Sequence, residues 1–409
     1  MSTHVAGETT PDPSTPAGPL DGIRVLDLTS VIMGPLATQL LGDLGADVIS
    51  IEGPEGDTNR VMGPGPVPGL SGVSLNLLRN KRSVGIDLKH PEGRAAFLRV
   101  AATADVMVTN LRPGPLRRLG LTYHDLAAVR PDILYCRASG YPSDSAKAEA
   151  PAYDDIIQSA SGIGDLFARQ GHQPSLLPTL VADKVAGMAI ANAILAGLLH
   201  RARTGQGQAI EVPMIDVMRA FVLVEHGAGA ISEPPMDRAG YRRILTAERR
   251  PQQTADGWIN ILPYQLEHYH AIFEIGGRQD LFDDPRIATR AARIENSDGL
   301  YHDIAEILRG RDSDFWIELC DRKGIPAERA ASLDELVAML PLAEHPTAGS
   351  YRVIPPPARF EQTPASVRRP APRIGEHTRT VLAEVGYGAE ELDRLEAAGV
   401  LHPASAPGG

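Results

Sequence analysis

The first part of the chain alternates short apolar runs with helical patterns. Strand-like runs occupy 23–28, 46–51, 84–88, 105–110 and 133–138. Helical patterns lie between and after them at 34–45, 91–102 and 123–129. This alternation is typical of a parallel sheet covered by helices. It predicts an α/β, Rossmann-like domain, although the Gly-x-Gly-x-x-Gly dinucleotide motif is absent after the first strand.

The longest apolar run, 185–199, belongs to a helical pattern that begins near Asp183 and stops at Thr204-Gly205. Asp183 is placed as an N-cap would be, accepting hydrogen bonds from free backbone N–H groups. The same position suits a nucleophilic carboxylate, so position alone leaves both readings open. The run is shorter than the ~20 residues that span a bilayer, which predicts a buried core helix.

Composition limits the partners and the compartment. The chain has 409 residues and a net charge of −11, which argues against nucleic acid and anionic membrane as partners. Its cysteines, Cys136 and Cys320, fit no metal or disulfide spacing, so a cytoplasmic protein is expected. The histidines show no zinc spacing, and we expect no metal.

Several motifs occur together in one order along the chain. They are G-A-D-V-I-x-I-E at 45–52, N-K-R-S-V-G-I-D-L at 80–88, V-x-N-x-R-P-G at 108–114, A-D-x-x-x-G-M at 182–188 and R-x-x-T-G-x-G-Q at 201–208. With the C-terminal PAPRIGEHTRTVLAEVGY, this pattern resembles the family III CoA-transferases from Leu20 to Leu401. That family includes formyl-CoA transferase, carnitine CoA-transferase and the α-methylacyl-CoA racemases.

The resemblance implies an activity and an organisation. Asp183 matches the family's catalytic carboxylate, which transfers CoA from an acyl-CoA to a carboxylic acid through an anhydride and an aspartyl-CoA thioester. We expect a disordered tail at 1–20, a large CoA-binding domain at 21–215, a smaller α+β domain at 216–342 and a C-terminal return to the large domain at 343–409. The resemblance also implies an interlocked homodimer.

Two basic loops are candidates for CoA contacts. Taken singly, each resembles an ordinary solvated charge run. Guanidinium groups pair phosphates well, and the resemblance implies that both loops flank CoA. The expected CoA-binding residues are Asn80, Lys81, Arg82, Asn110, Arg112 and Arg118. The family's basic residues near the second strand are replaced by Ser50 and Gly53, which leaves the adenine contact unassigned.

Tyr153 and Asp154 begin another helical pattern and are the expected substrate-binding residues. In the racemase branch the position of Tyr153 is a histidine that pairs with the catalytic aspartate as a second base. A tyrosine, with a pKa near ~10, serves poorly in that role. Transfer is therefore favoured over an α-methylacyl-CoA racemase-like isomerase, and a CoA-binding protein without catalysis is the remaining alternative. The sequence does not identify the acyl donor or the acceptor acid.

Overall fold

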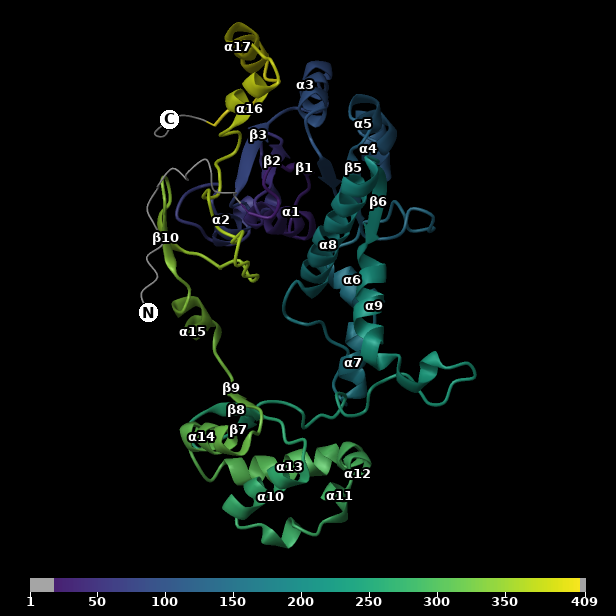
Figure 1. Cartoon of the computed structure of the whole chain (residues 1–409), viewed down its shortest axis with the longest axis vertical. Helices are drawn as coiled ribbons and strands as arrows, with labels where there is room; N and C mark the ends of the chain where they lie inside the picture. Colours follow the sequence, from purple (N-terminus) through teal and green to yellow (C-terminus); the bar gives the residue numbers. More distant parts are fainter. Residues whose placement is uncertain (1–17, 405–409) are drawn as a thin grey trace. The chain divides into compact units, whose positions relative to one another are not determined.

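The structure is a computed structural model that describes residues 18–404 and divides into two compact units (Figure 1). The larger unit contains the chain up to Ser161, Leu177–Arg219 and the chain from Leu340. The smaller unit contains Gly162–Leu176 and Ala220–Met339. The boundaries expected at 215 and 342 lie within a few residues of these, while most of the expected tail, 1–17, lies outside the described residues.

Segment 162–176 is the one clear difference, because we expected it in the large domain. Its side chains bond to the rest of the small unit. The Arg169 guanidinium donates to the carbonyl of Ala239 at 2.6 Å, and the Gln170 amide donates to the carbonyl of Ile244 at 3.3 Å. These contacts are remote in sequence, so no local pattern indicated them.

The large unit is built on a parallel six-stranded sheet with the order β3-β2-β1-β4-β5-β6. The strands are β1 (Arg24–Leu28), β2 (Asp47–Glu52), β3 (Lys81–Gly85), β4 (Val106–Thr109), β5 (Leu134–Ser139) and β6 (Gln208–Pro213). Val25 pairs with Val48 on one side and with Val106 on the other. The strand order therefore reverses direction between β1 and β4, and ligands of such sheets bind at the carboxyl ends of the strands at this point.

Helices cover both faces of the sheet. The helices α1 (Met33–Asp43) and α8 (Val181–Thr204) pack on each other, α1 against β1 and β2 and α8 against β5 and β6. The other face carries α3 (Pro91–Ala101), α4 (Pro113–Leu119), α5 (Tyr123–Val129), α16 (Thr378–Glu384) and α17 (Ala389–Ala397). Leu26, Phe97, Met107 and Leu382 lie in the core of this second face. The unit also contains η1 (Thr58–Val61), α2 (Gly72–Leu77) and α6 (Asp154–Ala160).

Helix α8 approaches α1 closely because its contacting residues are small. A Cβ atom at Gly187 would lie 2.8 Å from the carbonyl oxygen of Met33, so a larger residue would push the helices apart. The helix ends at Gly205, whose φ of 72° suits glycine. Within 18–404, α8 is the single helix long and apolar enough to cross a membrane, and its Ile190 and Ile194 are buried in the large unit.

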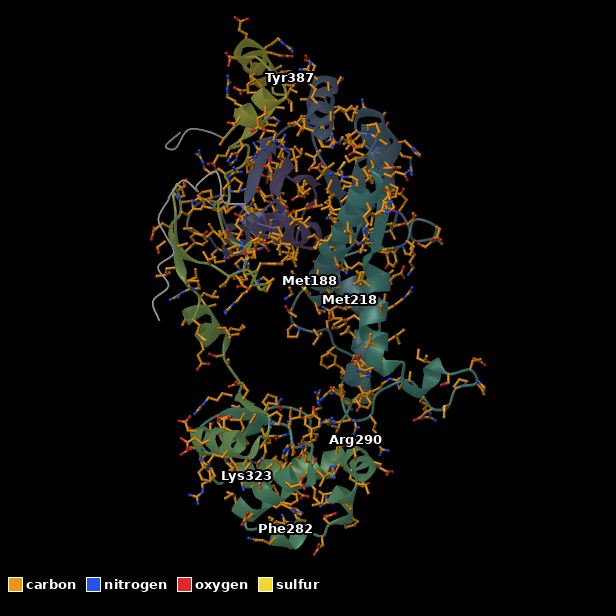
Figure 2. The ribbon with its side chains drawn as sticks, viewed as in Figure 1. Met188, Met218, Phe282, Arg290, Lys323 and Tyr387 are labelled. Carbon is orange, nitrogen blue, oxygen red and sulfur yellow. The ribbon has the colours of Figure 1, made fainter. Side chains whose placement is uncertain are left out.

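The C-terminal segment lies on the large unit. It contains the hairpin β10 (Leu342–His345) and β11 (Gly349–Arg352), followed by α16 and α17. Tyr387, labelled in Figure 2, lies after α16 with the Arg99 guanidinium 4.5 Å from the centre of its ring. Leu401 forms an antiparallel bridge with Ile86 beyond β3.

The small unit has its own core. Its antiparallel sheet consists of β7 (Gln252–Gln253), β8 (Trp258–Ile261) and β9 (Ala327–Arg329). Its helices are α7 (Ile163–Arg169), η2 (Ala228–Ile231), α10 (Leu266–Ile275), η3 (Gln279–Leu281), α11 (Pro285–Ala288), α12 (Arg290–Glu295), α13 (Ser297–Leu308), α14 (Ser313–Lys323) and α15 (Leu333–Ala338). Phe273, Ile304 and Trp316 are buried in the core between them. Helix α9 (Met214–His226) runs from the large unit into the small one.

Candidate active site

A cavity of about 320 Å³ lies in the large unit at the carboxyl ends of β1, β4 and β5. Its wall includes the turn after β1, the Asn110–Pro115 segment after β4 and Ala138–Gly140 at the end of β5. Asp183, from the first turn of α8, completes the wall. The cavity therefore lies at the point of the sheet where α/β proteins bind ligands.

Asp183 is the third residue of α8 and not its N-cap, which is Leu180. The N-cap reading of the sequence is therefore wrong by three positions. The side chain is only 8% exposed, yet it reaches the cavity. Burial raises the pKa of Asp183 to about 6, and the nearby charge of Asp154 adds to the increase. A carboxylate with this pKa is still mainly ionised at neutral pH.

Asp154, the first residue of α6, supports Asp183 from behind. Its Oδ1 accepts a hydrogen bond of 3.0 Å from the backbone N–H of Asp183, and its Oδ2 accepts one of 2.6 Å from Gln158 Nε2. The side chain is 3% exposed and is absent from the cavity wall. The expectation that Asp154 contacts the substrate is corrected, because donors inside the protein occupy both of its carboxylate oxygens.

Gln158 extends this support to the segment before α8. Its Oε1 accepts from the N–H of Leu177 at 2.9 Å, while its Nε2 donates to the carbonyls of Leu177 and Thr179 at 3.3 and 3.2 Å. Helix α6 therefore fixes the path of the chain into α8 and, with it, the position of the Asp183 carboxylate.

Tyr153 and Arg112 share the cavity with Asp183. Tyr153 is the N-cap residue of α6, and its side chain is 65% exposed. Arg112 is exposed at the start of α4, and its Nη1 donates to the carbonyl of Glu149 at 3.2 Å. The structure thus brings a phenol and a guanidinium to the wall that also contains Asp183.

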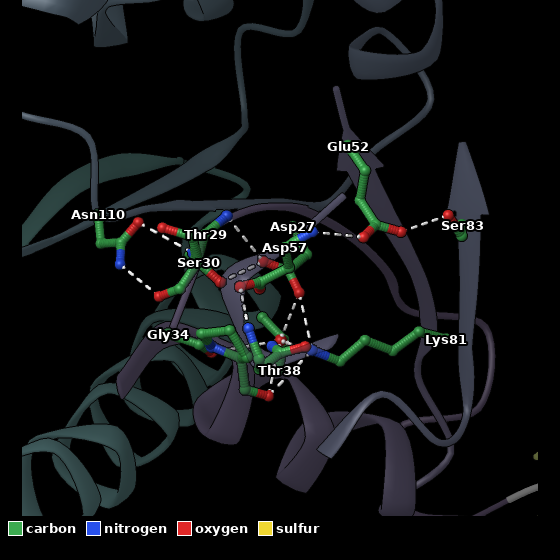
Figure 3. Close-up of polar contacts among 12 residues, drawn as sticks. Asp27, Thr29, Ser30, Gly34, Thr38, Glu52, Asp57, Lys81, Ser83 and Asn110 are labelled. Carbon is green, nitrogen blue, oxygen red and sulfur yellow. Dashed lines mark hydrogen bonds and ion pairs between the residues drawn. The ribbon is translucent and has the colours of Figure 1, made fainter. Parts of the chain in front are cut away.

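Lys81 and its neighbours are not at this site, contrary to expectation. Strand β3 begins at Lys81, three residues earlier than the apolar pattern indicated, so these residues lie inside the fold. Lys81 is fully buried, and its ammonium donates to Asp27 Oδ2 at 2.9 Å and to Thr38 Oγ1 at 2.8 Å (Figure 3). An ammonium with these partners stabilises the sheet and has no route to a phosphate.

Arg82 and Asn80 are committed to internal partners in the same way. The Arg82 guanidinium pairs with Asp47 and Glu384. The Asn80 amide donates to Asp43 and to the carbonyl of Ser366, both at 2.8 Å. Neither side chain lines the cavity. The expectation that 80–82 contacts CoA is corrected because all three side chains are buried and bonded.

Asn110 does line the cavity, but its amide is also engaged. Oδ1 accepts from the N–H of Ser30 at 3.1 Å and Nδ2 donates to the Ser30 carbonyl at 2.8 Å (Figure 3). Arg118 is exposed in the last turn of α4 and lies outside the cavity wall. Of the six expected CoA contacts, Asn110 and Arg112 are at the cavity and Arg118 is free to face solvent nearby in the same helix as the wall residue Pro113.

Asp57 contacts the cavity wall and was not among the residues expected from the sequence. It lies in the Gly/Pro-rich segment after β2, yet it is buried, and its Oδ1 accepts from the N–H of Val31, a wall residue, at 2.9 Å. The signal was present as Gly56-Asp57-Thr58, an aspartate that caps the short helix η1. Among residues 18–404, no group of histidine, cysteine and carboxylate side chains is arranged to hold a metal ion.

Comparison with known proteins agrees with this geometry. Residues 20–378 match the family model described as CoA-transferase family III. The chain is 33% identical over 390 residues to a probable fatty acyl-CoA transferase of Mycobacterium tuberculosis, covering 90% of this chain and 99% of that protein. It is 34% identical over 383 residues to a succinate–glutarate CoA-transferase of Agrobacterium fabrum, covering 90% and 96%.

A solved structure gives the same result. A CAIB/BAIF family protein from Brucella suis matches with a TM-score of 0.77 and 30% identity, covering 90% of this chain and 100% of that one. The sheet at whose carboxyl edge Asp183 lies is therefore the fold of this family, and these similarities extend over nearly the whole chain. The protein belongs to CoA-transferase family III.

Proposed function

We propose that this CoA-transferase moves CoA from an acyl-CoA donor to a carboxylic acid acceptor with Asp183 as the nucleophile. The observation that carries the proposal is the Asp183 carboxylate itself, buried at the base of a helix and open to a cavity at the carboxyl ends of β1, β4 and β5. Its pKa of about 6 leaves it ionised at neutral pH, and its burial leaves it poorly hydrated.

The reaction proceeds in two symmetrical halves. Asp183 attacks the thioester carbonyl of the donor, the C–S bond breaks, and an aspartyl–acyl anhydride and the CoA thiolate form. The thiolate attacks the aspartyl carbonyl and releases the donor acid, leaving an aspartyl-CoA thioester. The acceptor carboxylate then attacks this thioester and forms a second anhydride. The thiolate finally attacks the acceptor acyl carbon, which yields the new acyl-CoA and the free Asp183 carboxylate.

Residues in and around the cavity support these steps in different ways. Asp154 holds the Asp183 backbone at 3.0 Å and remains unreactive behind it. Arg112, on the cavity wall, and the exposed Arg118 of α4 are the candidate contacts for the three phosphoryl groups of CoA. Tyr153 is an exposed polar side chain on the wall and the candidate contact for the acyl or acceptor group. Succinate and glutarate, in the name of one relative, are the first acceptors to test.

Two variants at position 183 test the proposal. Asp183→Asn and Asp183→Ala should abolish transfer between succinyl-CoA and glutarate, or any other active pair, while CoA still binds. Retained turnover in either variant would contradict the nucleophile. Deuterium incorporation at the α-carbon of an acyl-CoA in D₂O, without transfer, would instead point to the isomerase branch.

We also propose a cytoplasmic homodimer. The exposed face of α8 carries Met188 and Leu199, each 54% exposed, and such apolar surface favours burial against a second copy. Cys136 and Cys320 are buried free thiols, which suits a reducing compartment. Analytical ultracentrifugation at micromolar concentration tests the assembly, and a monomer would contradict it.

A further inference from the structure

The turn between β1 and α1 is an unusually constrained part of the cavity wall. Ser30, Val31 and Met33 line the cavity that contains Asp183. Val31 has a φ of 72°, in the left-handed region that a β-branched residue rarely occupies. A conformation of this kind persists only where the surrounding structure holds it in place.

Side chains from two other segments form hydrogen bonds with the backbone of this turn. Asn110, after β4, uses its amide to bond both the N–H and the carbonyl of Ser30. Asp57 Oδ1 accepts from the N–H of Val31 at 2.9 Å, and Asn59 Nδ2 donates to the Val31 carbonyl at 3.2 Å. Every polar backbone atom of Ser30 and Val31 is thus bound by a side chain remote in sequence.

Asp57 is itself held firmly. The same Oδ1 accepts from the N–H of Asn59 at 3.1 Å, and the Asp57 N–H donates to Glu52 Oε1 at 3.1 Å (Figure 3). Glu52 is in turn fixed by the buried Arg60 guanidinium at 2.7 and 2.6 Å. Asp57, whose carboxylate bonds to Val31, is therefore held in turn by a buried ion pair between Glu52 and Arg60 at the end of β2.

The residues that flank the turn, Thr29 before it and Gly34 after it, are also fixed in position. Thr29 donates from both its N–H and its hydroxyl to Asp27 Oδ1, at 3.0 and 2.5 Å. A Cβ atom at Gly34 would lie 2.3 Å from Cβ of Thr29, so the start of α1 packs directly on the turn. Strain at Val31 is consequently retained between two fixed ends.

We propose that Asp57 is a positioning residue of the transfer reaction: it holds Val31 in the left-handed conformation and so sets the wall that orients the thioester beside Asp183. Asn59 and Asn110 complete the clamp. The inference rests on the proposed function and adds to it a residue outside the cavity wall. A wall displaced by a fraction of an ångström would misplace the reacting carbonyl, and errors of this size slow reactions strongly.

The charge on Asp57 is consistent with this role. Burial raises its pKa to about 6, against the lowering effects of the Val31 and Asn59 N–H groups and of Lys81, with Asp27 nearby raising it. Burying a carboxylate beside a cavity costs free energy, and ionisable groups with shifted pKa values concentrate at functional sites.

The test compares five variants of the full-length enzyme by kcat/KM and by the rate at which an acyl-CoA modifies Asp183. Asp57→Ala should lower both by about tenfold to a hundredfold. Asp57→Asn keeps the Oδ1 acceptor and should retain most of the activity. Val31→Gly in the Asp57→Ala background should recover part of the loss, because glycine adopts a positive φ without strain.

Asp105→Ala is the matched control. Asp105 also accepts a backbone N–H, from Arg24 at 2.8 Å, but it precedes β4 at the opposite end of the strands. It should lose stability and keep kcat/KM. If Asp57→Ala does not fold, Asn59→Ala, which removes only the donor to the Val31 carbonyl, should show a smaller loss in the same direction.

Folded Asp57→Ala with wild-type rates would overturn the inference, as would an equal loss in Asp105→Ala or no recovery from Val31→Gly. A different result would contradict the proposed function. Wild-type enzyme that transfers CoA without any adduct on Asp183 would contradict the anhydride chemistry, while the ratio of variant to wild-type kcat/KM would still test Asp57.

Discussion

The backbone N–H of Asp183 donates a hydrogen bond of 3.0 Å to Oδ1 of Asp154, so one carboxylate holds the other in place. The two acids come from different helices, and only one reaches the cavity. Asp154 fixes the first turn of α8 and also adds negative charge, which raises the pKa of Asp183 together with the larger effect of burial. Asp154 therefore affects both the position and the pKa of Asp183.

The first prediction concerns Asp154→Ala. Removal of the acceptor leaves the Asp183 N–H and the Gln158 amide without this partner, and the start of α8 loses its anchor. We expect kcat to fall by about tenfold to a hundredfold with a smaller change in KM. Steady-state kinetics of a variant with native circular dichroism measures this. An unchanged kcat would mean that Asp154 does not position the nucleophile.

The second prediction is a pH profile. In the proposed mechanism Asp183 must be ionised to attack, and burial raises its pKa to about 6. The rate of adduct formation should therefore be constant above pH 7 and fall about tenfold per pH unit well below 6. Single-turnover mixing with an acyl-CoA across pH 4.5–8 measures this pH dependence. The lower limit is about pH 4.5 because an ordinary aspartate is still mainly ionised there. A rate that stays constant down to the acid end of this range would contradict the raised pKa.

The third prediction concerns stability. The pKa of Asp183 rises from 3.8 in the unfolded chain to about 6 in the fold, so the native state binds more protons between these values. The free energy of unfolding contributed by this group therefore decreases as pH rises from about 4 to 6, and stays low above it. Asp183→Asn removes the buried charge and should stabilise the protein at pH 7 by about 1–2 kcal/mol.

Denaturant titration at two pH values tests this difference. The variant should gain stability over wild type at pH 7 and lose most of that gain at pH 4.5, where wild-type Asp183 is protonated. A variant less stable than wild type at pH 7 would show that the Asp183 charge is better compensated than its burial indicates.

The fourth prediction separates buried cations from CoA-binding ones. Lys81→Met leaves Asp27 buried without its ammonium partner and should cost about 3–5 kcal/mol of stability. Arg118→Ala, at an exposed position, should leave stability unchanged and raise KM for acyl-CoA by about tenfold. Thermal unfolding and steady-state kinetics of both variants give the comparison. A stable Lys81→Met enzyme with a raised KM would restore the original expectation for Lys81.

Much of the fold was predictable because apolar periodicity is local. The strands from Arg24 to Ser139 and the helices α1, α3 and α5 lie where the pattern placed them, within a few residues. Strand β3 begins early because its first residues are charged. Lys81 and Arg82 are tolerated in a buried strand only through Asp27, Asp47 and Glu384, and partners so remote are not visible in a local pattern.

The site was predictable in the same uneven way. The motif resemblance indicated Asp183, Tyr153 and Arg112 as candidates, and the structure places all three at one cavity. The hydrogen bonds of Asp57 and Asp154 to the backbone N–H groups of Val31 and Asp183 were not predicted, since each joins segments that are remote in sequence. Resemblance transfers the residues that match a motif, whereas such supporting contacts appear only once the chain is folded.

Mass spectrometry of the intact enzyme, mixed with a panel of acyl-CoAs and trapped with hydroxylamine or borohydride, tests most directly whether Asp183 is the nucleophile. We expect a modification that peptide mapping places on Asp183, absent in Asp183→Ala and present in Asp105→Ala. Active enzyme that transfers CoA without any modification of Asp183, or with the modification on another residue, would show that Asp183 is not the nucleophile.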